Sequence, residues 1–148
     1  MLKHILICTD GSRLAGKGIK AGVKLAKALG ARVSGVYVAP PWTVPVYGEG
    51  MTYGIPRSPH QYKSAIEKAG RKVLAILEIE AETEGVPCTI QVVTADWPWQ
   101  GIVRTAKSRR CDAIVMASHG RGGLGGLLLG SETTRVLAHS KLPVLVIR

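Results

Sequence analysis

A glycine-rich segment near the N-terminus has most of a spacing that proteins use to hold nucleotide phosphates. The run from Gly11 to Gly18 reads GSRLAGKG and fits the first seven positions of the P-loop pattern, between an apolar run and a helical pattern. At the eighth position Gly18 replaces the Ser or Thr whose hydroxyl would hold magnesium, and no acidic residue ends an apolar strand to serve as the second metal contact. The sequence therefore argues against a P-loop, and Lys17 is better interpreted as one of several solvated lysines on a helix.

A second glycine-rich segment fits the dinucleotide-binding pattern GxGxxG. Residues 120–125 have this spacing, but they lie in the fourth strand-to-helix connection, and no acidic residue follows the next strand to bind a ribose. Chance matches are expected in a run so rich in glycine. By itself this spacing is weak support for nucleotide binding, and a flexible loop explains it equally well.

The longer segment from Ala117 to Thr133 makes a more coherent phosphate site. Its glycine-rich loop leaves a buried strand and returns to the N-terminus of a helix, where free backbone N–H groups and the helix dipole attract anions. Gly120 and Gly130 would let backbone N–H groups approach phosphate oxygens closely. Ser131 and Thr133 add hydroxyl donors beside them. This segment therefore predicts a site for the phosphates of a ligand.

Glu132 is the residue in this segment that does not suit a phosphate. A carboxylate in the first turn of a helix is favourable with the helix dipole without any ligand, and it would repel a phosphate if it pointed inward. If the Glu132 side chain faces water, its backbone N–H remains available to a ligand.

Hydrophobic periodicity predicts alternating strands and helices that would position these residues. Short continuous apolar runs indicate strands buried on both faces, and apolar residues spaced three and four apart indicate helices. The predicted strands are 5–8, 33–38, 88–95, 113–117 and 143–147, and the predicted helices are 13–29, 59–84, one that begins at Pro98, and 131–139. On the helix 59–84, the apolar residues spaced for one buried face are Ile66, Ala69, Val73, Ile76 and Leu77. Residues 39–58, with several prolines and glycines, are interpreted as an irregular insertion that forms a lid or a partner surface.

This order of elements predicts an α/β fold with a doubly wound, five-stranded, mostly parallel sheet of the Rossmann-like kind and helices on both faces. The length of 148 residues and the 46% hydrophobic content suit one domain over residues 1–148. In such sheets, ligands bind beyond the carboxyl ends of the strands where the strand order reverses. We therefore expect the ligand at the strand tips that follow Cys8, Val38 and Ala117.

Charge and cysteine content narrow the classes of partner. Twenty Lys and Arg against ten Asp and Glu give a net charge of +10, which favours anionic partners. The lysines on the helix 13–29 lack interleaved aromatics, so the sequence argues against nucleic acid. The three cysteines show neither a disulfide framework nor a metal-binding spacing. We expect a cytoplasmic protein without a membrane partner, because no apolar run is long enough for a membrane span.

Several motifs taken together resemble the universal stress protein family. They are Ser118-His119-Gly120-Arg121, Gly130-Ser131, the final run from Leu142 to Ile147 and the opening run from Ile5 to Ser12. In the nucleotide-binding branch of that family the pattern is glycine, two residues, glycine, nine residues, then glycine and Ser or Thr. Gly120, the nine residues after it, Gly130 and Ser131 match this pattern, whereas Ala117 stands in place of the first glycine. An alanine suits that position only if φ is negative there. Cys8 is a further departure, because proline is frequent at that position in the branch.

The resemblance implies a homodimeric ATP-binding protein that uses Mg²⁺ or Mn²⁺ and acts as a stress-linked sensor or regulator. It implies that Thr9 and Asp10 lie beside the adenosine and that the backbone of Val38 contacts the adenine edge. The residues it implies around the ribose and phosphates are Ala117, Ser118, His119, Gly120, Arg121, Gly122, Gly123, Gly130, Ser131, Glu132 and Thr133. It also implies that the dimer forms through the last strand, which the sequence independently predicts to be a sheet edge.

Two other functions remain open from the sequence. A slow ATP hydrolase or phosphotransfer enzyme would need a residue that activates water, and only His119 and Asp10 are candidates. A structural role fits His119 better, because the sequence places no Ser, Asp or Cys beside it. The other alternative is a protein-interaction module that binds no nucleotide. Ala117 and Glu132, which do not suit a nucleotide site, and the insertion 39–58 favour this alternative.

Three residues near the expected ligand site have ordinary structural interpretations as well. Asp10 suits either an adenosine contact or a turn before the first helix. Trp97 and Trp99, at the end of the third strand, could form a partner surface, but we interpret them as packing over the sheet.

Overall fold

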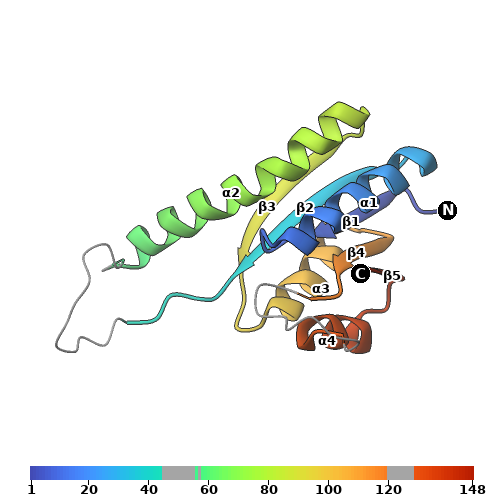
Figure 1. Cartoon of the computed structure of the whole chain (residues 1–148). Coiled ribbons are helices and arrows are strands. Elements are labelled where there is room, and N and C mark those ends of the chain that lie inside the picture. The colour runs from blue at the N-terminus through green and yellow to red at the C-terminus, as the bar shows by residue number, and fades with distance from the viewer. Residues whose placement is uncertain (45–55, 57, 120–128) are drawn as a thin grey trace.

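The computed structural model describes residues 1–44, 56, 58–119 and 129–148. These residues form a five-stranded sheet with the strand order β3-β2-β1-β4-β5 (Figure 1). The strands are β1 (His4–Cys8), β2 (Arg32–Ala39), β3 (Cys88–Thr94), β4 (Ala113–Ala117) and β5 (Val144–Ile147). The helices are α1 (Arg13–Leu29), α2 (Pro59–Glu84), α3 (Pro98–Ser108) and α4 (Ser131–His139). All four strand pairings are parallel, which confirms the expected doubly wound α/β fold.

Helices cover both faces of the sheet. α1 and α2 pack on one face, and α3 and α4 pack on the other (Figure 1). Every residue of β1, the middle strand of the sheet, and of its neighbour β4 is buried. Ile5 and Ile7 lie in the core under α1 and α2, whereas Leu6 lies in the core under α3 and α4. This explains why the central strands are continuously apolar in sequence.

α1 has the expected amphipathic form. The buried positions include Ile19, Gly22, Val23 and Ala26, and the lysines at 17, 20, 24 and 27 are exposed. The Ser12 hydroxyl accepts a hydrogen bond from the backbone N–H of Ala15 at 3.1 Å and so caps the N-terminus. Gly30 ends the helix in the left-handed conformation with φ 61°.

The buried face of α2 differs from the expected one. Gly70, Leu74, Leu77 and Ala81 are buried, whereas Ile76 is 54% exposed. A Cβ atom on Gly70 would lie 2.5 Å from the Val92 side chain of β3, so the helix approaches the sheet closely along its small residues. Counting apolar side chains alone does not detect such a face, because glycine contributes nothing to the count although it allows the closest packing.

The strand order reverses between β1 and β4. β1 pairs with β2 on one side and with β4 on the other. The chain leaves β1 for α1 on one face of the sheet and leaves β4 for α4 on the opposite face. Diverging connections of this kind open a crevice at the carboxyl ends of the strands.

The insertion expected at 39–58 is described only in part. Ala39 ends β2, residues 40–44 follow it without regular secondary structure, and 45–55 and 57 lie outside the described residues. Its role as a lid or partner surface therefore stays a prediction. Among the described residues, no helix combines the length and the apolar character that a membrane span requires.

Candidate functional site

A cavity of about 430 Å³ lies at the carboxyl ends of β1, β2 and β4, where the strand order reverses. The N-terminal turns of α3 and α4 form its other side. Its lining residues are Cys8, Thr9, Asp10, Ala15, Val36, Val38, Pro98, Ile102, Met116, Ala117, His119, Gly130, Ser131, Glu132 and Thr133. The cavity thus brings together residues from six elements, β1, α1, β2, α3, β4 and α4, and from the turns that follow β1 and β4.

The side of the cavity next to β1 is a tight turn that leads into α1. The Thr9 hydroxyl accepts from the backbone N–H of Gly11 at 3.2 Å, and Asp10 Oδ1 accepts from the backbone N–H of Ser12 at 2.9 Å. Gly11 has φ 80°, a conformation that L side chains rarely adopt. Asp10 therefore shapes the turn and lines the cavity at the same time, so its two interpretations are compatible.

The inner part of the cavity is apolar. Val36 and Val38 of β2 share it with Ile102 of α3 and Met116 of β4. Burial raises the pKa of the Cys8 thiol far above its usual range, so this group stays protonated and contributes apolar surface. A flat apolar ring system is the kind of group that such a lining accommodates.

The N-terminus of α4 is fastened to the end of β4. The backbone N–H of Gly130 donates to the Ser118 carbonyl at 2.8 Å. The Thr133 hydroxyl, which is buried, donates to the carbonyls of Ala117 and Ser118, each at 3.0 Å. The Thr133 hydroxyl thus holds the helix to the strand, and Ser131 is the exposed hydroxyl of this turn that lines the cavity.

Gly130 lies where the backbone of two segments comes closest. A Cβ atom at this position would lie 3.0 Å from the Ser118 carbonyl oxygen and 3.4 Å from His119 Cα. Its φ of −61° is open to any residue, so close approach, and not an unusual backbone conformation, explains the glycine.

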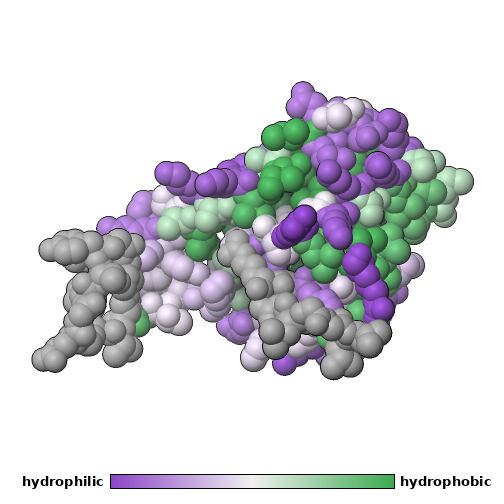
Figure 2. Space-filling model, viewed as in Figure 1, coloured by the Kyte–Doolittle hydropathy of each residue, from purple (hydrophilic) through white to green (hydrophobic). Residues whose placement is uncertain are grey.

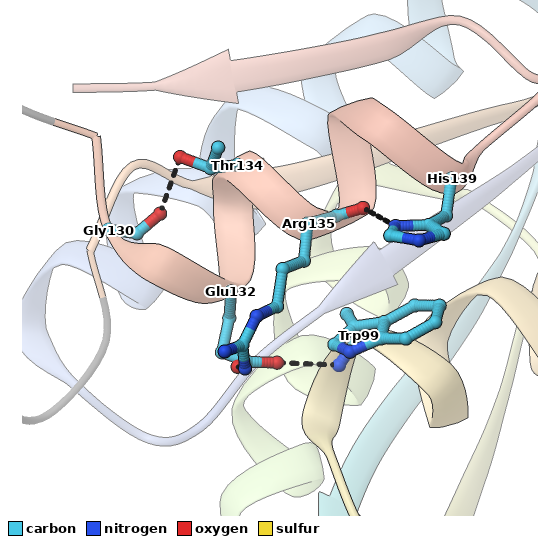
Figure 3. Close-up of polar contacts among 6 residues, drawn as sticks. All are labelled: Trp99, Gly130, Glu132, Thr134, Arg135 and His139. Atoms are coloured by element: carbon cyan, nitrogen blue, oxygen red, sulfur yellow. Dashed lines mark hydrogen bonds and ion pairs between the residues drawn. The ribbon is translucent and has the colours of Figure 1, made fainter.

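The Glu132 side chain is bound by other parts of the protein and does not simply face water. Glu132 Oε2 accepts a hydrogen bond from the backbone N–H of Trp99 at 2.8 Å, and Oε1 pairs with the Arg135 guanidinium at 2.9 Å (Figure 3). Trp97, the N-cap residue of α3, makes no side-chain cap hydrogen bond. Glu132 of α4 therefore caps α3 from outside, and the free N–H groups at the start of α3 explain why a carboxylate is stable there.

The two tryptophans behave differently from each other. Trp99 stacks on His139 with ring centroids 4.1 Å apart and packs against the core under α3 and α4 (Figure 3). Trp97 is 50% exposed, and the Arg135 guanidinium lies 4.6 Å above its ring. The packing interpretation is confirmed for Trp99 and wrong for Trp97.

The sequence could not place a hydroxyl beside His119, but the structure does. Ser118 Oγ lies 3.0 Å from His119 Nδ1. Ser118 is 2% exposed and does not line the cavity, whereas His119 does. The contact therefore orients the imidazole at the cavity and leaves the Ser118 hydroxyl out of reach of a ligand.

Most of the expected site residues lie together at this cavity. Thr9, Asp10, Val38, Ala117, His119, Gly130, Ser131, Glu132 and Thr133 line it, and Ser118 lies directly behind it. Gly120, Arg121, Gly122 and Gly123 lie outside the described residues.

Six further lining residues were not among the site residues predicted from the sequence. They are Cys8, Ala15, Val36, Pro98, Ile102 and Met116. Two of them could have been found from the sequence. Val36 precedes Val38 by two residues and so shares its face of β2. Pro98 lies in the first turn of the helix that follows the third strand, close to the carboxyl end of that strand. Among the described residues, no group of three or more His, Cys, Asp or Glu is arranged to hold a metal ion.

Comparison with known proteins identifies relatives over the whole length. Residues 1–148 match the model of the universal stress protein family. A universal stress protein of Thermus aquaticus is 35% identical over 148 residues, which is all of both chains. The solved structure of protein MJ0577 from Methanocaldococcus jannaschii matches with a TM-score of 0.77 at 27% identity, over 99% of this chain and 96% of that one.

Two further structures of this kind contain adenine nucleotides. A universal stress protein in complex with cAMP matches with a TM-score of 0.71 at 20% identity, over 99% of this chain and 97% of that one. One from Archaeoglobus fulgidus in complex with dAMP matches with a TM-score of 0.66 at 19% identity, over 100% of this chain and 98% of that one. At these identities the two structures show the fold of the present chain.

Proposed function

Because this chain belongs to the universal stress protein family, we propose that its 430 Å³ cavity binds an adenine nucleotide, ATP with Mg²⁺ or Mn²⁺, and that the protein acts as a nucleotide-dependent sensor or regulator in the cytoplasm. One observation carries the proposal. The residues that the glycine pattern singles out around Gly130 line the same cavity as Asp10 and Val38, at the point where doubly wound sheets bind ligands.

The cavity offers a different surface to each part of a nucleotide. The base would lie against the apolar inner surface formed by Val36, Val38, Ile102 and Met116. The ribose would lie next to Asp10. The phosphates would lie at the N-terminus of α4, where the first-turn N–H groups, the helix dipole and the Ser131 hydroxyl favour an anion.

A divalent cation fits this arrangement if the nucleotide supplies most of its ligands. Magnesium in nucleotide sites is bound by one or two carboxylates together with phosphate oxygens and water. Asp10 brings a carboxylate to the cavity while its Oδ1 accepts from the backbone N–H of Ser12, and both oxygens of Glu132 are engaged by α3 and Arg135. The metal would neutralise phosphate charge there, and the protein would contribute Asp10 and the α4 N-terminus.

Two other proteins of this fold have been solved with adenine nucleotides. The complexes with cAMP and dAMP show that proteins of this fold accommodate adenine nucleotides of different phosphate arrangement. At identities of 20% and 19%, the ligand of the present chain is inferred from the residues that line its own cavity.

The second part of the proposal is a homodimer through β5. β5 lies at one edge of the sheet and pairs with β4 on its inner side. Leu145 on this strand is 42% exposed, and Figure 2 shows hydrophobic surface on the side of the molecule where β5 lies. Pairing or packing of two such edges would bury apolar surface and protect the strand from other partners.

Calorimetric titration of the nucleotide-stripped protein tests the proposal. ATP, AMP and GTP are titrated in magnesium buffer, and ATP alone is repeated in EDTA. We expect ATP to bind with at least about a tenfold preference over GTP, because guanine would bury an additional carbonyl group against the apolar surface next to β2 without a hydrogen-bond partner. Weaker ATP binding in EDTA would support the metal. Absence of binding by all three nucleotides would exclude the proposal and leave a protein-interaction role.

A further inference from the structure

A second cavity, of about 600 Å³, lies at the opposite end of the sheet from the candidate nucleotide site. The starts of β1, β2 and β4 and the C-terminal ends of α1, α2 and α3 surround it. Its lining residues are Met1, Lys3, His4, Ala26, Lys27, Gly30, Ala31, Arg32, Gly85, Val86, Pro87, Arg110 and Asp112. None of these residues lines the first cavity, so the two spaces are separate.

The charge of this second cavity is strongly positive. The Asp112 carboxylate already accepts hydrogen bonds from the backbone N–H groups of Lys3 and His4, at 2.8 and 2.9 Å. Lys27 is paired with Glu84 at 2.7 Å. The cationic groups of Lys3, Arg32 and Arg110 make no ion pair within the described part of the chain. Three cations without an ion pair therefore line the cavity together with one carboxylate, that of Asp112.

Arg110 stands in a conformation that usually belongs to glycine. α1 and α2 are followed by Gly30 and Gly85 with φ 61° and 69°, whereas the corresponding position after α3 is Arg110 with φ 54°. Within the described residues, Arg110 is the one non-glycine residue with positive φ. Glycine would relieve this backbone strain, so the guanidinium is retained at a cost in conformational free energy.

The wall of the cavity contains a buried imidazole with an unused ring nitrogen. His4 is 6% exposed, and its Nε2 lies 2.8 Å from Ser34 Oγ, which in turn lies 3.1 Å from Thr89 Oγ1. The Arg109 carbonyl is near enough to act on the pKa of His4, but Nδ1 makes no hydrogen bond of normal geometry with any described residue. A buried polar atom in this state is expected to meet water or a ligand.

We propose that this cavity is a second ligand site, which binds a small molecule through a dianionic phosphate group held by Lys3, Arg32 and Arg110. Charge-assisted hydrogen bonds from arginine forks suit phosphate oxygens in particular. The site does not depend on nucleotide binding at the other end of the sheet.

The test follows backbone amide resonances of the full chain during titration with inorganic phosphate at constant ionic strength. We expect saturable shifts at His4, Arg32, Val86 and Asp112. The variant Arg32→Gln/Arg110→Gly removes two cations and relieves the strained backbone, so it should fold normally. We expect it to bind phosphate at least about tenfold more weakly, because two charge-assisted contacts are lost.

The control removes the same charge elsewhere. Lys68 and Lys72 are exposed on α2 and line neither cavity, so Lys68→Gln/Lys72→Gln should leave phosphate affinity within about twofold. An equal loss in both variants would show general attraction by the net charge and would overturn the proposal. Shifts confined to Ser131 and Thr133 would place phosphate at α4 and overturn it too. Absence of saturable shifts would mean that these cations only balance the carbonyl ends of α1, α2 and α3.

Discussion

Glu132 connects two helices at the edge of the candidate nucleotide cavity. Its two carboxylate oxygens bind the start of α3 through Trp99 and the guanidinium of Arg135. Glu132 therefore fixes the position of the α4 N-terminus relative to α3, the two elements that form one side of the cavity. Its contribution is a matter of both stability and geometry.

Replacing Glu132 by alanine should destabilise the fold by about 1–2 kcal/mol, because the N–H of Trp99 loses its acceptor and α3 loses its cap. Glutamine at this position should cost less, since it keeps an acceptor oxygen. Urea unfolding measures both. Glu67→Ala is the control, because Glu67 and Arg71 form an exposed pair within α2. That change should cost only about 0.3–0.5 kcal/mol. Equal costs at the two positions would contradict the capping role.

Substitution of Gly130 tests whether the N-terminus of α4 takes part in the proposed nucleotide site. In Gly130→Val the added Cβ would lie 3.0 Å from the Ser118 carbonyl oxygen, so the turn that carries the first N–H groups of α4 must shift. We expect nucleotide affinity to fall at least about tenfold while circular dichroism stays unchanged. Gly16→Val is the control, because no atom within 4 Å would meet a Cβ there. Unchanged affinity in a folded Gly130→Val protein would count against the α4 assignment.

His4 should make stability depend on pH near neutrality. Burial lowers the pKa of His4, and Arg32 lowers it further, so the unfolded chain binds a proton at higher pH than the folded protein does. The contribution of His4 to the free energy of unfolding is fully present above about pH 6.5, the pKa of histidine in the unfolded chain. It is lost as the pH falls toward the lower pKa of the folded protein. Urea unfolding of the wild type and of His4→Gln at pH 7.5 and 5.5 measures it. A wild type that loses no more stability than the variant would contradict the prediction.

The sequence predicted the site residues that local patterns mark, but not the contacts that depend on how distant elements pack. Asp10, Val38 and Gly130 were found because each lies at a strand tip or a helix start, which are positions that local patterns mark. The partner of Glu132 was not found, since Trp99 is 33 positions away and the bond depends on how α3 and α4 pack. The same limit applies to Met116 and Ile102, whose cavity contacts follow from tertiary packing.

At the scale of elements, α2 shows that the residues predicted from an apolar pattern and the residues that are buried can differ. Sequence patterns predicted the bounds of α1, α2 and β4, and the ends of β2, β3 and β5 differed by single residues. Caps and turn glycines mark such ends locally. The buried face of α2 could not be predicted in the same way, because it depends on Gly70 and on the depth to which the sheet admits the helix.

Two truncations on α2 distinguish its two faces. Leu74 is fully buried, so Leu74→Ala should destabilise the protein by about 2–5 kcal/mol. Ile76, which sequence periodicity assigned to the core, is 54% exposed, and Ile76→Ala should cost about 0.5 kcal/mol or less. Thermal or urea unfolding compares them. A larger loss for Ile76→Ala than for Leu74→Ala would show that the helix is rotated from the described orientation.

At the scale of the whole molecule, the two sheet edges differ. β3 lies at one edge, where α2 packs over it, and β5 lies at the other with Leu145 exposed. This asymmetry favours β5 as the edge through which two copies of the chain would meet.

A charge on β5 should dissociate the proposed dimer without unfolding the subunit. We expect Leu145→Lys to raise the dimer dissociation constant at least about tenfold, because a lysine at this edge opposes the approach of a second strand. Sedimentation velocity over a range of concentrations measures the change. Ile79→Lys is the control, since Ile79 is 64% exposed on α2, away from β5. Dimers that persist in Leu145→Lys, or that dissociate equally in Ile79→Lys, would exclude β5 as the interface.

The central place of β1 has a consequence for how the chain is made. β1 is synthesised first, yet one of its two neighbours is β4, which begins at Ala113. At about 5–20 residues per second, a ribosome needs on the order of 5–20 s to reach β4 after finishing β1. During that interval an apolar strand edge in the nascent chain has no native partner. Chaperones that cover apolar segments of nascent chains would therefore matter most for this protein between the completion of β2 and the emergence of β4.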